Sequence, residues 1–105
     1  MTKYDNYELL ELFEKEPFFP YKGETEIFDY SKNDEFGFKF TLYVNIYEET
    51  CIVSLRYKDF KVPIFDIKFE KITNIKCDNE KIILTQENRE NNIIISVKPS
   101  FSINL

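Results

Sequence analysis

The sequence predicts an α+β fold in which one N-terminal amphipathic helix packs on a curved antiparallel sheet of six to eight strands, with a small β-barrel as the alternative. Three observations lead to this prediction: an alternating run at residues 36–57, a helical pattern at residues 6–16, and many Phe, Tyr and Ile residues without any Ala. Aromatic and β-branched side chains fit a pleated sheet, whereas Ala is the best helix former. At 105 residues, the chain is expected to form a single domain over residues 1–105.

The clearest element is the predicted hairpin at residues 36–57. From Phe36 to Ile46, every second residue is Phe or a branched aliphatic residue, and the residues between are mostly polar or Tyr. Successive strand side chains point to opposite faces, so one face of this strand is apolar. Residues 48–50 turn the chain, and the alternation resumes at Cys51. The even-numbered residues of the first strand are therefore expected to face the core.

The helix is predicted at residues 6–16. Asp5 and Glu8 have the spacing of a capping box, and Leu9, Leu12 and Phe13 share one side of a helical wheel. Pro17 is expected to end the helix, because a proline disfavours helical geometry in the residue before it.

The remaining strands are shorter. Alternation predicts these strands at residues 25–30, 65–69, 81–86, 92–97 and 101–105, and a further short strand that ends at residue 77. The strand pattern is also expected to continue through Phe60 and Val62 up to Pro63.

The charge distribution favours a basic protein as the partner. The net charge is −5, and residues 1–57 hold twelve of the 19 acidic residues against six of the 14 basic ones. Nucleic acids and anionic membranes need clustered positive charge, so neither is expected as a partner. The alternative is that the acidity only keeps the protein soluble. No signal peptide or bilayer-spanning stretch is evident, so we expect a cytoplasmic protein with Cys51 and Cys77 reduced, a disulfide being the alternative.

Residue types that carry catalysis are scarce. The chain has no His, its two cysteines do not form a CxxC pair, and its two glycines cannot build a phosphate-binding loop. We therefore predict that the protein is not an enzyme and has no catalytic residues, cofactor or metal site. Paired acids at residues 34–35 and 48–49 could in principle hydrolyse a glycoside, but charged residues in turns are ordinarily solvated.

The polar face of the hairpin is the predicted binding surface. Tyr residues keep a hydrogen-bonding tip while burying area, which is typical of interface anchors. The alternative is that residues 18–21 or a terminal strand cover this face, so that Tyr43 belongs to the core. The anchors and the flanking acidic residues that we predict to contact a partner are Tyr43, Asn45 and Tyr47, with Asp34, Glu35, Glu48 and Glu49.

A short, acidic chain rich in Ile, Asn, Lys and Phe, with one N-terminal helix and strands ending in KPSFSINL, resembles the small immunity proteins that bacteria encode beside polymorphic or contact-dependent toxins. The resemblance rests on size, charge and layout. It implies an intracellular inhibitor that binds a cognate, basic toxin domain and occludes its active site. The alternative is a structural or adaptor domain that binds other proteins.

Overall fold

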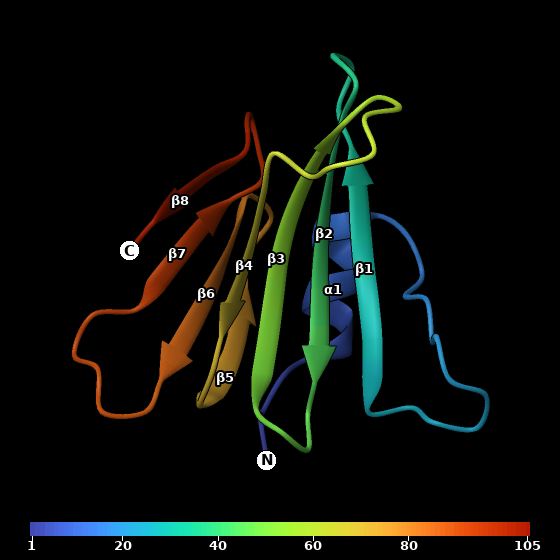
Figure 1. The fold of residues 1–105 in the computed structure, drawn as a ribbon. Helices are drawn as coiled ribbons and strands as arrows, with labels where there is room; N and C mark the ends of the chain where they lie inside the picture. Colours follow the sequence, from blue (N-terminus) through green and yellow to red (C-terminus); the bar gives the residue numbers. More distant parts are fainter.

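A computed structural model describes residues 1–105 as one helix and eight strands, arranged in two four-stranded antiparallel sheets (Figure 1). The first sheet has the strand order β1-β2-β3-β4, and the second has the order β5-β6-β7-β8. The predicted α+β class is confirmed, with eight strands that do not close into a barrel. The elements are α1 (Asn6–Phe13), β1 (Ile27–Asn33), β2 (Phe38–Asn45), β3 (Thr50–Tyr57), β4 (Phe65–Phe69), β5 (Ile72–Cys77), β6 (Lys81–Gln86), β7 (Ile93–Ser96) and β8 (Ser102–Asn104).

The predicted hairpin is formed by β2 and β3. Phe40, Leu42 and Val44 are at most 2% exposed, so the even-numbered residues of β2 face the core. Phe36 is the exception, because β2 begins only at Phe38 and the Phe36 side chain is 68% exposed. The alternating pattern therefore predicted the inward face of the strand and was wrong only where the strand gives way to a turn.

The helix is shorter than predicted. Asp5 caps it, since its carboxylate accepts a hydrogen bond of 2.8 Å from the backbone N–H of Tyr7. Glu8 does not complete the capping box, because its carboxylate instead accepts from the N–H of Cys77 at 2.9 Å. The helix ends at Phe13, and Glu14 takes a left-handed conformation at φ 57°. Helix α1 therefore stops before Pro17 acts on it.

Helix α1 lies behind β1 and β2 and covers the inner face of the first sheet (Figure 1). The ring of Phe13 stacks on Tyr30 at 5.2 Å and on Phe40 at 6.2 Å between centroids. Phe40 also stacks at 5.4 Å on Phe101, which precedes β8. The helix and both sheets thus contribute to one hydrophobic cluster of 21 buried residues.

The antiparallel order breaks between β4 and β5. Lys71 has a left-handed φ of 56°, and the N–H of Ile72 then bonds to the carbonyl of Glu49 instead of pairing with β4. A register shift between Ile72 and Asn74 marks a β-bulge in β5. Because a bulge adds one residue to a strand, it explains how Ile72 and Ile75 can both be buried at a spacing of three.

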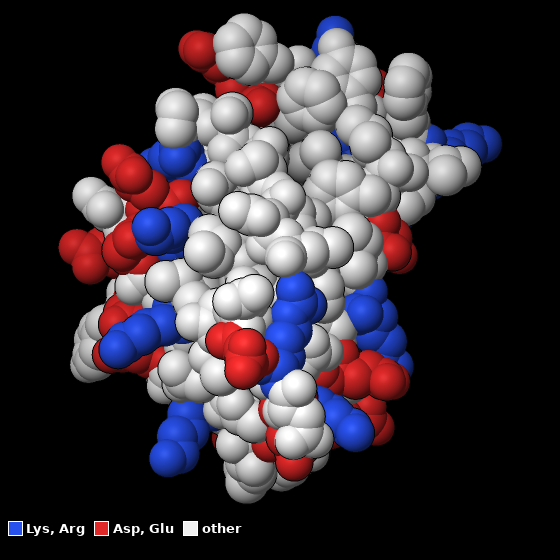
Figure 2. Space-filling model, turned by 90° about the vertical axis from the view of Figure 1, so that its left-hand side faces the viewer, with Lys and Arg blue, Asp and Glu red and all other residues white.

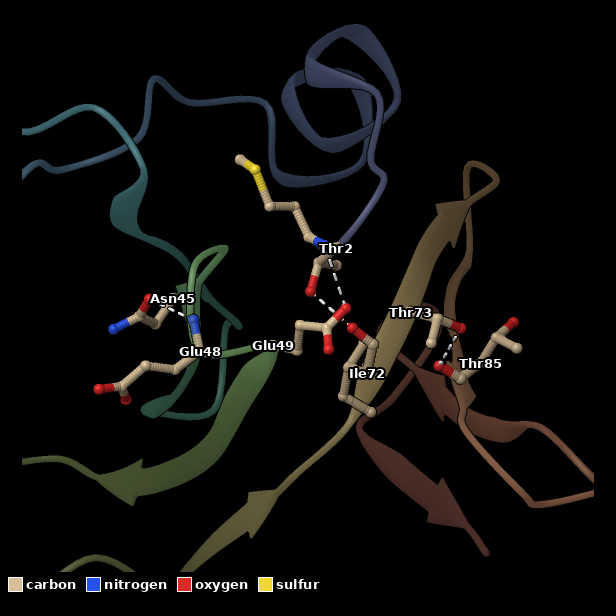
Figure 3. Close-up of polar contacts among 8 residues, drawn as sticks. Thr2, Asn45, Glu48, Glu49, Ile72, Thr73 and Thr85 are labelled. Atoms are coloured by element: carbon tan, nitrogen blue, oxygen red, sulfur yellow. Dashed lines mark hydrogen bonds and ion pairs between the residues drawn. The ribbon is translucent and has the colours of Figure 1, made fainter.

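The first residues of the chain join the two sheets (Figure 3). The N–H of Thr2 bonds to the carbonyl of Ile46 at the end of the β2–β3 hairpin. The Thr2 hydroxyl donates to the carbonyl of Ile72 on β5. Lys3 then pairs with β5 through bonds of 2.9 and 2.8 Å to Thr73 and Ile75. This segment fixes one sheet against the other.

The prediction that the strand pattern continues through residues 60–62 is wrong. Lys58 has φ 47° and turns the chain out of β3, so that Phe60 and Val62 lie in a loop with 65% and 75% of their surfaces exposed. At the other end of the chain, Leu105 is also exposed, whereas Phe101 and Ile103 pack partly against the core, as predicted.

Candidate functional site

The side of the first sheet turned away from the core, which we call the outer face, carries the predicted anchors. Tyr43 lies on β2 between Asp29 of β1 and Ile52 of β3, and it is 42% exposed. The next row of this face consists of the small polar side chains of Ser31, Thr41 and Ser54. Tyr43 therefore stands above its neighbours, and the alternative in which it belongs to the core is wrong.

Two hollows flank Tyr43. The larger, of about 690 Å³, lies between the connector of residues 15–21 and the outer face of β1 and β2. The smaller, of about 210 Å³, reaches from Tyr43 past Asn45 and Glu48 to Lys68. The larger hollow has a volume in the range of small-molecule pockets, and the smaller one lies below that range. Tyr43, Pro20 and Ile27 line both hollows, so together they form one uneven surface centred on Tyr43.

The connector lies beside the edge of β1 and leaves Tyr43 uncovered. Phe18 pairs with Asp29 through backbone hydrogen bonds of 2.8 and 2.9 Å. Burial raises the pKa of the Asp29 carboxyl, while Lys39 and Lys15 oppose the shift. Asp29 therefore has both cationic side chains close to it, and this part of the outer face carries charges of both signs.

At one end of β2, Asp34 has a structural role. Its carboxylate accepts hydrogen bonds of 2.9 Å from the N–H groups of Phe36 and Phe38, which fixes the β1–β2 turn. The neighbouring Glu35 is exposed. This pair and the acidic pair at residues 48–49 lie at opposite ends of β2, about 24 Å apart for an eight-residue strand.

At the other end, the two carboxylates of the second pair point apart (Figure 3). Glu49 points toward the first residues of the chain, where its Oε2 lies 3.3 Å from the amino group of Met1. Glu48 points away, and its backbone N–H is bound by the Asn45 side chain at 3.1 Å. Tyr47 projects from the same turn and is 57% exposed. Tyr47 and Glu48 are therefore free to contact a partner, while Asn45 and Glu49 hold the turn.

The outer face itself is not acidic. Its strands present the cations Lys39, Arg56 and Lys68 as well as the anions Asp29 and Asp66. The predicted acidic residues lie at the two ends of this face. The structure therefore brings Tyr43, Asn45 and Glu48 together and places Asp34 and Glu35 far from them.

The groups that usually carry catalysis are not gathered here. Burial raises the pKa of both the Cys51 and the Cys77 thiol to about 12, so neither is a thiolate near neutral pH. Both cysteines are free, as expected. Two-carboxylate glycosidases hold their acids within about 10 Å of each other, so an acid at one end of β2 cannot act together with an acid at the other end, about 24 Å away. No three acidic or cysteine residues come together to hold a metal ion, and no helix has the length and apolar character that crossing a bilayer requires.

Sequence reasoning missed two further surfaces. Figure 2 shows the side of the molecule that carries β7 and β8, where a strip of uncharged side chains runs between charged margins. Ile83, Ile94 and Asn104 form one cross-strand row of this sheet. The second surface is an exposed apolar cluster at the upper end of the first sheet. The sequence signal for this cluster was the pair of apolar residues Phe60 and Val62 just before Pro63, which the sequence analysis interpreted as part of a strand.

The comparisons with known proteins point to one fold. No family model matches the chain, and no curated protein matches it. A chain of the contact-dependent growth inhibition toxin–immunity protein complex from Klebsiella pneumoniae 342 is similar in structure, with a TM-score of 0.71 and 22% identity over 98% of this chain and 94% of that chain. This similarity shows that the chain shares its fold with a component of a toxin–immunity protein complex, the class of system that the predicted resemblance named.

Proposed function

We propose that this protein is an immunity protein that binds and neutralises a toxin domain. The observation that carries the proposal is the shared fold, which extends over nearly the full length of both chains. The similar chain belongs to a toxin–immunity protein complex. A fold alone does not define a function, so the residues must also fit an inhibitor.

Such a complex contains two kinds of chain, and the residues here favour the inhibitor. A toxin domain with enzymatic activity needs nucleophiles and general bases. This chain has no His, and its only thiols are buried and protonated. The exposed rings of Tyr43, on the outer face, and Tyr47, in the adjoining turn, are instead typical of binding anchors. We therefore assign it a non-enzymatic role without a cofactor, in the cytoplasm, where a toxin would act.

Binding through the outer face would occlude the toxin's active site. Tyr43 and Tyr47 would serve as anchors, because each exposes a large part of a rigid amphipathic ring. Glu35 and Glu48 have exposed carboxylates and could steer a basic toxin domain, consistent with the net charge of −5. Nucleic acid and membrane are not proposed as partners, because the outer face carries nearly equal numbers of cations and anions.

Co-expression with a candidate toxin domain, taken from a reading frame next to the one that encodes this chain, tests the proposal. The wild-type protein should restore growth of cells that express that domain, and the purified pair should form a complex measurable by calorimetry. Tyr43→Ala should weaken binding by about tenfold or more, as for an interface anchor. Tyr7→Ala is the matched control, because Tyr7 is 81% exposed on α1, which covers the inner face of the first sheet. Growth arrest despite soluble wild-type protein would contradict the proposal.

A structural role is the second candidate, and the uncharged strip of the second sheet favours it (Figure 2). The strip lies beside β8, which pairs with β7 only and leaves its other edge open. Uncovered strand edges can pair with further chains. Stable self-association in sedimentation experiments, without any binding of a toxin domain, would support this candidate.

A further inference from the structure

We infer that an apolar tip, formed by Phe36, Phe60, Val62 and Ile64, is the main anchor for the toxin domain and enters an apolar recess on it. The inference rests on the proposed function and identifies the surface that carries the affinity. The tip lies at the upper end of the first sheet, where the β1–β2 turn and the β3–β4 loop meet (Figure 1).

The four side chains of the tip are 53% to 75% exposed. The rings of Phe38 and Tyr57 lie 4.7 Å apart, and Phe60 meets Tyr57 edge-on at 5.7 Å. Phe60 therefore extends the aromatic contacts of the first sheet outward, and the Lys58 ammonium lies 5.1 Å from the centre of the Tyr57 ring.

Hydrogen bonds hold the two loops of the tip in place. The N–H of Lys58 donates to the carbonyl of Gly37 at 2.8 Å, which joins one loop to the other. The Arg56 guanidinium, on the outer face, donates to the carbonyl of Lys61 at 3.1 Å. A surface that is already ordered loses little conformational entropy when it binds, so burial of the tip would convert efficiently into affinity.

The exposed area of the tip selects the kind of occupant. Taking 150 to 250 Å² for a whole aromatic side chain, the four residues expose on the order of 400 Å². A stable interface buries about 800 Å² on each partner, so two copies meeting tip to tip would reach only about half of that. A larger partner could cover the tip and continue along Arg56 to the outer face. This continuity favours the toxin domain over a second copy of this chain.

The charges around the tip indicate what its recess contains. Glu35 and Asp59 are exposed beside it, but so are Lys58 and Lys61, and the four charges cancel. Charge therefore contributes little attraction at this point, and the recess must offer apolar surface. Burial of apolar side chains depends weakly on salt, in contrast to attraction between charged surfaces.

Variants at the tip test the inference, with the candidate toxin domain from the neighbouring reading frame as the probe. Val62→Asp places a charge on the most exposed tip residue, and Phe36→Ser with Phe60→Ser removes both rings. Each should weaken the complex about 100-fold or more, mainly through faster dissociation. Tyr7→Ser is the control, because it removes an exposed ring from α1. Melting temperatures should stay close to that of the wild type, because all these side chains are mostly exposed.

The outcomes separate the two proposals. If the wild-type protein does not bind the toxin domain, the proposed function fails, and this inference fails with it. If the wild type binds and the tip variants bind equally well with native melting temperatures, the inference alone is overturned. Concentration-dependent dimerisation that Val62→Asp abolishes would also overturn it, in favour of a second copy as the occupant. Loss of toxin binding in both tip variants but not in Tyr7→Ser is the expected result.

Discussion

Replacing Phe40 by Ala should remove a large part of the stability of this protein. Phe40 is fully buried and lies between Phe13 of α1 and Phe101 before β8, with centroid distances of 6.2 and 5.4 Å. Truncating a buried Phe costs about 3 to 5 kcal/mol. At about 0.05 to 0.15 kcal/mol per residue, a chain of 105 residues has a free energy of unfolding of roughly 5 to 15 kcal/mol. The substitution should therefore remove at least about a fifth of it, and in the least stable case nearly all.

Phe36→Ala is the matched control, because Phe36 has the same parity in the alternating run but is 68% exposed. Its cost should stay within about 0.5 kcal/mol. Urea denaturation followed by circular dichroism measures both values, and a loss of 3 to 5 kcal/mol should move the midpoint by about 2 M. Equal losses for the two variants, or a loss under about 1 kcal/mol for Phe40→Ala, would refute the assignment of the inward face.

Three further predictions concern the contacts that fix the fold. Thr2→Val should lower the free energy of unfolding by about 1 to 3 kcal/mol, because it leaves the carbonyl of Ile72 without its donor, whereas Thr2→Ser should not. Cys51 and Cys77 should resist a thiol reagent until the protein unfolds. Burial raises the pKa of each thiol from about 9 to about 12, so stability should fall as pH rises from 9 to 12, because the unfolded state loses these protons first. Gly37→Ala should destabilise by about 1 kcal/mol or more in thermal melts, because φ is +102° and a Cβ would lie 2.9 Å from the Lys58 side chain.

Most of the fold could be predicted from the sequence because its strands are half-buried. A strand with one face in the core requires apolar residues at every second position, and the run from Phe38 to Val44 shows that requirement directly. The break between the two sheets could not be predicted in this way. It depends on a left-handed residue at Lys71 and on a bond from Ile72 to the distant Glu49. Only the spacing of Ile72 and Ile75, which a bulge explains, hinted at an irregular strand.

For the candidate site, the sequence left open whether a polar residue in a turn binds a group of its own chain or a partner. Asp34, Asn45 and Glu49 were expected to contact a partner, and in the structure each binds a group of its own chain. Sequence does not distinguish a carboxylate that accepts local N–H groups from one that is free, because both are exposed acids in turns. Tyr43 and Glu48 remain available to a partner. Their role in binding is still a prediction.

The separation between the acidic residues and the apolar tip means that rate and affinity can be tested apart. Glu48 lies at the far end of β2 from the tip, so its charge should act mainly on the encounter with a basic partner, whereas the tip should act on the lifetime of the complex. At an ionic strength of about 0.1 M, salt screens the attraction between exposed charges more than about 10 Å apart, so raising the salt concentration would weaken the first effect and leave the second nearly unchanged. A toxin complex whose dissociation rate rises strongly with salt would require that charged contacts, and not the four apolar side chains, supply most of its affinity.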